Sequence, residues 1–294
     1  MRPLTQSPAP TRQAPRSPAF SSVLCAVDGT HASFAAVAHA AALAGASARL
    51  TLLVVTASGS GSANFRSAAI SPQRASSILE RAARIAAQAG VSCERAIDTS
   101  GPPAAVILGH ASSCDLLAIG APARSPLGTV GAAVVRATLR SFETPLLLGR
   151  RGRAGTSLLD RVLIASDGTD SSEMLVAFTS SLLGDRVGEL VLVNAVGSES
   201  HSQPHRIAAE ERLLREAHKE RVRLLVEPGN PASVILHAAE EQRATLVVLG
   251  SRRLSGIGAA LGSVSRRVVR ELPCTALVLP PERLRQNDAA GPAA

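Results

Sequence analysis

The strongest constraint on this chain is a duplication within it. The run VLCAVDGT at residues 23–30 returns as VLIASDGT at residues 162–169. A second pair, DLLAIG at 115–120 and TLVVLG at 245–250, recurs in the same order. Because two separate motifs repeat in one order, a whole folding unit has been duplicated, and 294 residues suit two domains of ordinary size. The sequence therefore predicts two homologous domains, one in each half.

The composition narrows the possible functions. Lys219 is the only lysine and is followed by Glu220, so a P-loop for ATP hydrolysis, which needs Gly-Lys-Ser/Thr, is excluded. The net charge of +8 is almost entirely arginine. These arginines are scattered and the chain has no Tyr or Trp to stack on bases, so nucleic acid is not an expected partner. The four cysteines lack CxxC spacing, which disfavours disulfide and zinc roles.

The hydropathy pattern predicts a cytoplasmic protein without a membrane partner. No uncharged apolar run reaches the roughly 18 to 20 residues of a membrane span, and the proline-rich start lacks the apolar stretch of a signal peptide. Residues 1–20 and 282–294 are predicted to be disordered tails, and residues 151–157 a linker. The folded domains are predicted at 21–150 and 158–281.

Short apolar runs alternate with helical patterns through both halves. Strands are expected at 23–27, 50–55, 91–97, 116–119, 145–148, 162–166, 189–195, 222–226, 245–249 and 275–279. Helices are expected at 33–43, 72–89, 103–110, 128–139, 171–183, 205–220, 231–241 and 262–271. This alternation is typical of a parallel sheet that is covered on both faces. The predicted fold class is α/β, with two tandem Rossmann-like domains, each an open five-stranded parallel sheet with helices on both faces.

The second copy has a glycine-rich loop where such a sheet binds ligands. Residues 250–265 leave a predicted strand, pass four glycines and enter a predicted helix. Backbone N–H groups and the positive end of the helix dipole favour phosphate there, and Ser263 and Ser265 can add hydroxyl donors. Asp167, after the first strand of this copy, would face the same crevice and could accept from an adenine amino group or a ribose hydroxyl. The alternative is a plain glycine-rich connection with Asp167 capping the next helix.

Four motifs of the second copy together resemble those of universal stress proteins. They are the apolar strand followed by Asp-Gly-Thr at 167–169, GNPASVIL at 229–236, LGSR at 249–252, and GSVS at 262–265 with Val268-Val269 and Pro273-Cys274 after it. The resemblance covers both halves and implies a tandem member of the family, with adenine nucleotide alpha hydrolase-like domains and a role in the stress response. It also implies ATP as the ligand, with Mg²⁺ only as a companion of the nucleotide.

The resemblance implies a role for each matched position. Asp167 would hold the base or ribose, Leu249 and Gly250 the ribose and phosphates, and a strand-two residue, Val193, would contact adenine. Gly262, Ser263, Val264 and Ser265 would contact the phosphates.

The second copy departs from the family loop, G-x2-G-x9-G-[ST], in two ways. Arg253 replaces its second glycine, and Gly250 to Gly262 is 12 steps where the pattern gives 13. Arg252 or Arg253 would either contact phosphate directly, which replaces lost backbone donors, or close the site with a bulky side chain.

The first copy departs further. Gly120 to Gly128 is only 8 steps, and Pro122 and Pro126 lie between them, so this loop is short, stiff and poor in N–H donors. Its weaker candidate set is Asp28, Gly120, Gly128 and Thr129. The first copy is therefore expected to be structural, and the nucleotide site is expected in the second.

The expected partners are an adenine nucleotide and the other copy of the domain. The family resemblance implies pairing through the last strands, 145–148 and 275–279, and a homodimer of the whole chain is a further possibility. No nucleophile and base come together in the sequence, and no SGGxDS or KMSKS loop is present, so a binding module is expected and an enzyme is not. The family resemblance leaves slow ATP hydrolysis or self-phosphorylation open, but no residue of this chain requires either. His201 and His205 lack a third metal ligand, so no metal site is expected. The alternative function is a nucleotide-free scaffold for dimerisation and interaction.

Overall fold

A computed structural model of the chain describes residues 20–56, 70–121, 137, 144–197, 203–251, 262–281 and 284. The first half contains β1 (Ser22–Ala26), α1 (His31–Ala44), β2 (Arg49–Val55), α2 (Pro72–Gln88), β3 (Cys93–Asp98), α3 (Pro103–Ala111), β4 (Leu116–Gly120) and β5 (Leu146–Gly149). The second half contains β6 (Arg161–Ser166), α5 (Asp170–Leu183), β7 (Glu189–Val196), α6 (Pro204–His218), β8 (Val222–Pro228), α7 (Pro231–Glu241), β9 (Leu246–Gly250), α8 (Ser263–Glu271) and β10 (Thr275–Leu279). The predicted helix at 128–139 lies outside the described residues except for residue 137.

Local sequence explains where these elements begin and what they bury. Helices α1, α2 and α7 follow Thr30, Ser71 and Asn230, whose side chains accept hydrogen bonds from the first helical N–H groups. Helices α2, α3, α6 and α7 have proline in the first turn, where its missing N–H costs nothing. Strands β4, β5 and β10 are buried along their whole length, as uniformly apolar strands of a covered sheet must be.

Within the described residues the strands form one ten-stranded sheet in the order β3-β2-β1-β4-β5-β10-β9-β6-β7-β8. Neighbouring strands are parallel except for β5 and β10, which pair antiparallel with Leu147 opposite Leu277. The predicted contact between the last strands of the two copies is therefore present. The predicted α/β fold class is confirmed, but the two sets of five strands are parts of one sheet and not two separate sheets.

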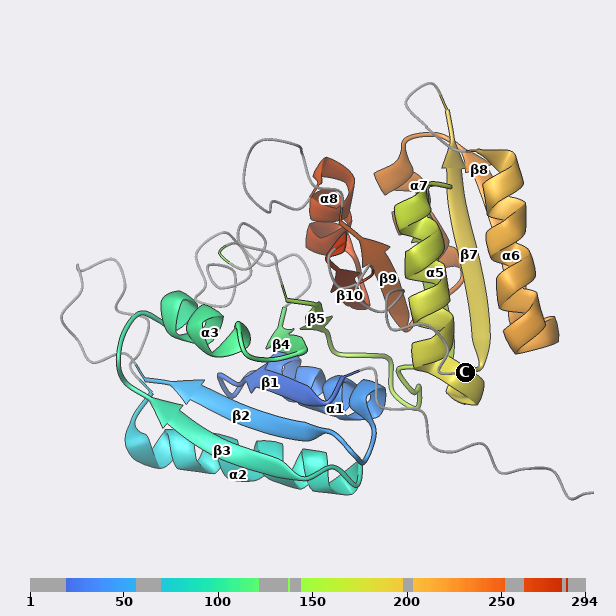
Figure 1. Cartoon of the computed structure of the whole chain (residues 1–294). Helices are drawn as coiled ribbons and strands as arrows, with labels where there is room; N and C mark the ends of the chain where they lie inside the picture. Colours follow the sequence, from blue (N-terminus) through green and yellow to red (C-terminus); the bar gives the residue numbers. More distant parts are fainter. Residues whose placement is uncertain are drawn as a thin grey trace, which may run out of the picture.

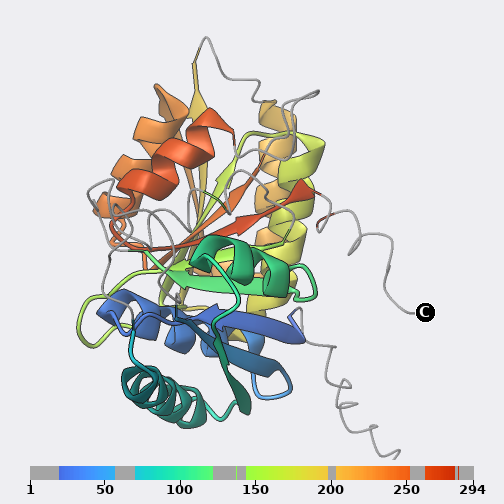
Figure 2. The same cartoon turned by 90° about the vertical axis from the view of Figure 1, so that its left-hand side faces the viewer.

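Helices cover both faces of this sheet. Helices α1, α2, α5 and α6 share one apolar core with it, and α3, α7 and α8 share the other. Figure 1 shows α2 below the strands of the first half, next to β3, and α3 above β1 and β2. Figure 2 shows α7 and α8 on one side of the second half, with α5 and α6 on the other. Among the described residues, no helix has the length and apolar character required to cross a membrane.

The two halves also make contacts beyond the strand pair. Arg186 donates to the carbonyls of Ala42 at 2.6 Å and Leu182 at 2.7 Å, so one guanidinium caps the ends of α1 and α5. The rings of Phe20 and Phe178 meet edge to face with centroids 5.9 Å apart. Phe20 is fully buried, although the sequence places it at the end of the predicted tail. These contacts fix α5 of the second copy against the first copy.

Candidate functional site

The candidate site lies at the carboxyl ends of β6 and β9. Strand β6 pairs with β7 on one side and β9 on the other, so the strand order of the second copy reverses here. Ile164 pairs with Val248, and Asp167 and Gly250 follow this pair by three and two residues. The fold therefore brings together the two positions that the sequence singled out.

The Asp167 side chain organises the turn between β6 and α5. Its Oδ1 accepts from the Thr169 N–H at 3.1 Å and from the Thr169 hydroxyl at 2.6 Å. The N-cap of α5 is Thr169, so Asp167 holds a turn and does not itself cap the helix. In the first copy Asp28 and Thr30 make the same pair of contacts, at 2.9 and 2.6 Å. Asp167 is half-buried, however, whereas Asp28 is exposed.

The first turn of α8 provides the backbone donors expected for phosphate. Gly262 is the N-cap residue and has no side chain to cap the helix, unlike the threonine of α5 or the asparagine of α7. Ser263 is exposed at the first helical position. The Ser265 hydroxyl donates to the Gly250 carbonyl at 2.9 Å, so this side chain ties α8 to the end of β9.

The other end of α8 is held by an arginine from the first copy. Arg150 is buried, and its guanidinium donates to the carbonyls of Val269 at 2.6 Å, of Leu272, and of Ala121 at 3.2 Å. Burial lowers the pKa of Arg150, but a cation at a helix C-terminus is favourable. This contact could not be predicted from the sequence, because Val269 and Leu272 are more than a hundred positions from Arg150 and accept through backbone carbonyls.

The turn of Asp167 rests on a buried polar network that the sequence analysis missed. Glu210 of α6 is 1% exposed and accepts from the hydroxyls of Ser172 at 2.7 Å and Ser166 at 2.5 Å. Burial raises the pKa of Glu210, and the two serine hydrogen bonds oppose that rise. The helical spacing of Glu210 from the buried residues Ile207 and Leu214 was the signal that could have located it.

The remaining predicted site residues lie in the core, at the start of α8, or outside the described residues. Val193 and Leu249 are 1% and 2% exposed and belong to the core under α7 and α8. Gly262 and Val264 are half-buried at the start of α8. Arg252, Arg253, Gly128 and Thr129 lie outside the described residues.

Two glycines at matching positions show how the copies differ. A methyl group on Gly120 would lie 2.3 Å from the backbone nitrogen of Ser33, so the start of α1 packs directly on the end of β4. A methyl group on Gly250 would meet its nearest described neighbour, Leu175 Cδ2, at an ordinary 3.7 Å. Among the described residues, α5 therefore leaves room over Gly250 that α1 removes over Gly120.

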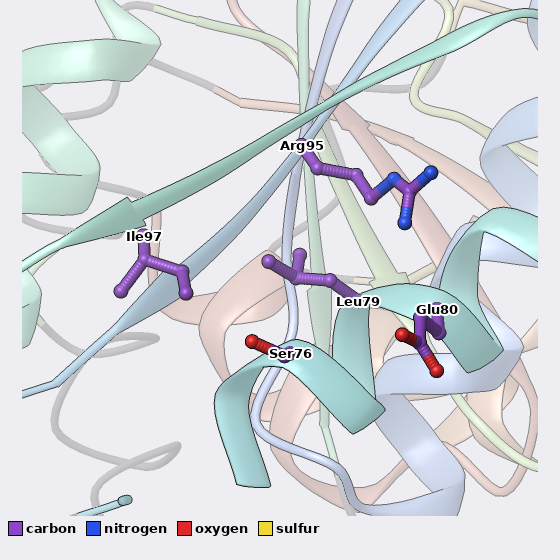
Figure 3. A pocket seen from close by; sticks show the side chains of 5 residues that line it. All are labelled: Ser76, Leu79, Glu80, Arg95 and Ile97. Atoms are coloured by element: carbon purple, nitrogen blue, oxygen red, sulfur yellow. The ribbon is translucent and has the colours of Figure 1, made fainter. Parts of the chain in front are cut away.

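A surface hollow in the first copy lies away from these strand ends. Figure 3 shows Ser76, Leu79 and Glu80 of α2 facing Arg95 and Ile97 of the edge strand β3. The described residues contain no group of three or more His, Cys, Asp or Glu side chains able to hold a metal ion.

Comparison with known proteins identifies the family. The model of the Universal stress protein family matches twice, at residues 19–150 and 159–280. The chain belongs to the universal stress protein family. The resemblance read from its motifs is confirmed, and both halves are members.

Known universal stress proteins also match in sequence and in fold. A "universal stress protein in QAH/OAS sulfhydrylase 3′ region" from Thermus aquaticus is 31% identical over 132 residues, which is 40% of this chain and 96% of that protein. The match to the structure of a universal stress protein from Archaeoglobus fulgidus covers 88% of this chain and 98% of that one, with a TM-score of 0.70 at 22% identity. The match to the structure of protein PA1789 of Pseudomonas aeruginosa, described as functionally unknown, covers 92% of this chain and 96% of that one, with a TM-score of 0.62 at 17% identity. The two structures share the tandem fold.

Proposed function

We propose that the second copy of this universal stress protein binds an adenine nucleotide, ATP in the first instance, as a cytoplasmic stress-response module. The observation behind the proposal is the meeting of Asp167, Gly250 and the start of α8, whose N-cap residue Gly262 has no side chain, at the carboxyl ends of β6 and β9. A carboxylate suits an amino or hydroxyl donor, and the N–H groups in the first turn of a helix suit phosphate. An adenine nucleotide offers both chemistries on one molecule.

The residues of the second copy fit this ligand in distinct ways. The N–H groups of Ser263 and Val264 would contact phosphate, and Ser263 adds an exposed hydroxyl. Ser265 would act indirectly, because its hydroxyl already holds the Gly250 carbonyl. Mg²⁺ would arrive with the phosphates, since no cluster of metal-ligating side chains is present in the described part of the chain.

The first copy would serve as a structural partner. The start of α1 fills the space beside Gly120, and the matching Asp28 is exposed. Its buried Arg150 instead holds α8 of the second copy. One chain would then contain one nucleotide site and one supporting domain.

Binding without turnover is the expected activity. The Asp167 Oδ1 already accepts two hydrogen bonds from Thr169, and the Glu210 carboxyl is buried between two serines. The hydroxyls that these carboxyls contact hold the turn between β6 and α5, and those of Ser166 and Ser172 are buried, so we do not expect them to act as nucleophiles.

The test begins with ligand release from the purified full-length protein. With no Tyr or Trp in the chain, ultraviolet absorbance of the supernatant after denaturation reports a nucleotide directly, and titration calorimetry with ATP then gives Kd. Asp167→Ala should raise Kd about 10- to 100-fold, the value of one or two hydrogen bonds to a charged group. The matched control Asp28→Ala should leave Kd unchanged.

Two results would reject this proposal. Equal effects of the two substitutions would reject the assignment to the second copy. No released nucleotide and no titration heat would favour the nucleotide-free scaffold.

A further inference from the structure

The buried carboxyl of Glu210 stands directly behind the Asp167 turn. The side chain comes from α6, is 1% exposed, and contacts one serine of β6 and one of α5. A carboxyl removed from water lowers stability unless hydrogen bonds offset the loss of hydration. Its burial therefore calls for a reason other than packing.

The two serines connect Glu210 to the backbone of the turn. The Ser166 oxygen accepts from the Gly168 N–H at 3.1 Å, and the Ser172 oxygen accepts from the Thr169 N–H at 2.9 Å. Each serine oxygen therefore lies between the Glu210 carboxylate and a backbone N–H of the turn, and Ser172 Oγ also lies 2.9 Å from the Thr169 carbonyl oxygen. Thr169 in turn donates to Asp167, so the contacts run without a break from Glu210 to the proposed ligand-binding carboxylate.

The first copy forms the same turn without this network. When α2 and α6 are aligned at Pro72 and Pro204, Ile78 takes the place of Glu210. When the Asp-Gly-Thr motifs are aligned, Val27 takes the place of Ser166, and both apolar replacements are buried. The fold therefore does not require the carboxyl, and the copy that lacks it is also the copy with the exposed aspartate and the filled space at Gly120.

We propose that Glu210 is a positioning residue for the ligand site of the second copy, which holds the turn of Asp167 in place through Ser166 and Ser172. This inference rests on the proposed nucleotide binding. Glu210 does not touch the ligand, and it acts only through the turn.

The first copy supplies the substitutions for the test. The double variant Ser166→Val, Glu210→Ile installs the apolar pair that the first copy already accommodates. Glu210→Gln keeps the shape of the side chain and one acceptor oxygen. Glu216→Gln, on the exposed face of the same helix, is the matched control, since its side chain is 73% exposed.

Three quantities are measured on the full chain: the Kd for ATP, the thermal midpoint Tm, and the exchange rates of individual amides by NMR without nucleotide. The double variant should raise Kd about tenfold, as loss of a supporting partner does at other sites. The Gly168 and Thr169 amides should exchange faster, while the Val248 amide in β9 is unchanged. Tm should stay level or rise by about 2 to 4 °C, because apolar residues replace a buried polar network.

The two single variants check the mechanism. Glu210→Gln should raise Kd by about threefold or less, since it retains an acceptor. Glu216→Gln should match the wild type in all three measurements.

Two results would overturn the proposal: unchanged Kd and amide exchange in the double variant, or a lower Tm with faster exchange throughout the domain. The latter would show that the network serves stability alone. A wild type without affinity for ATP would instead refute the proposed function. In that case the exchange rates of Gly168 and Thr169 would still decide whether Glu210 holds the turn.

Discussion

His39 should make the pairing of the two halves sensitive to acid. It lies on α1 of the first copy, and its Nδ1 is 2.9 Å from the hydroxyl oxygen of Thr275 on β10 of the second. Burial lowers the pKa of His39 from 6.5 to about 4. The imidazole is therefore neutral in the folded protein at pH values where the unfolded chain is already protonated.

The sign and size of the effect follow from this difference. Between pH 6.5 and about 4 the unfolded chain binds a proton at His39 that the folded protein does not, so acidification favours unfolding. At about 1.4 kcal/mol per pH unit, the full interval corresponds to about 3 kcal/mol of unfolding free energy. This stability is present above pH 6.5 and is lost as the pH falls to about 4.

Urea denaturation followed by far-ultraviolet circular dichroism would test the prediction, since the chain has no Tyr or Trp for fluorescence. His39→Gln keeps an acceptor for Thr275 but cannot be protonated. Its unfolding free energy should lose about 3 kcal/mol less than that of the wild type between neutral pH and pH 4. His31→Gln, exposed at the start of the same helix, controls for removal of an imidazole.

The difference between the His39 variant and the wild type is the quantity to compare. The pKa of Glu210 is raised, so this residue makes the unfolding free energy rise as the pH falls, opposite to the effect of His39. Both proteins contain Glu210, so its contribution cancels in the difference. A variant whose stability falls with acid as steeply as that of the wild type would refute the reasoning.

Two further predictions concern positions where the copies differ. Gly120→Ala places a methyl group 2.3 Å from the Ser33 nitrogen and should cost about 1 to 3 kcal/mol or more of unfolding free energy, whereas Gly250→Ala should change it by less than about 0.5 kcal/mol. Equal urea midpoints for the two variants would contradict this comparison. Arg150→Met leaves the carbonyls of Val269 and Leu272 without their buried donor and should cost about 1 to 3 kcal/mol for each. Calorimetry that finds no loss would show that the guanidinium does not hold α8.

Most of the fold could be predicted because its signals are local. Pro103 and Pro231 mark the first turns of α3 and α7, and the apolar run at 275–279 is the strand β10. The repeat itself fixed the order of elements in the second half once the first had been interpreted. The two sets of strands join into one sheet through the pairing of β5 with β10, which are far apart in the sequence. Only the family resemblance predicted this pairing.

The candidate site was less predictable because much of it depends on tertiary contacts. Asp167 and Gly250 were located by their places after apolar strands, which a parallel sheet brings together. Glu210 was missed because it stands among charged residues that suggest an exposed helix surface. Arg150 was missed because its acceptors are backbone carbonyls, which leave no trace in the sequence.

The antiparallel contact between β5 and β10 has a consequence for how the two copies could diverge. Since both strands belong to one polypeptide, their pairing is an intramolecular event whose extent does not fall on dilution. Across this strand pair each domain meets the other, unlike copy of the same chain, so a substitution on one side can be compensated by a different substitution on the other. A linked pair of this kind can lose a ligand site from one member and keep the surface that the other requires.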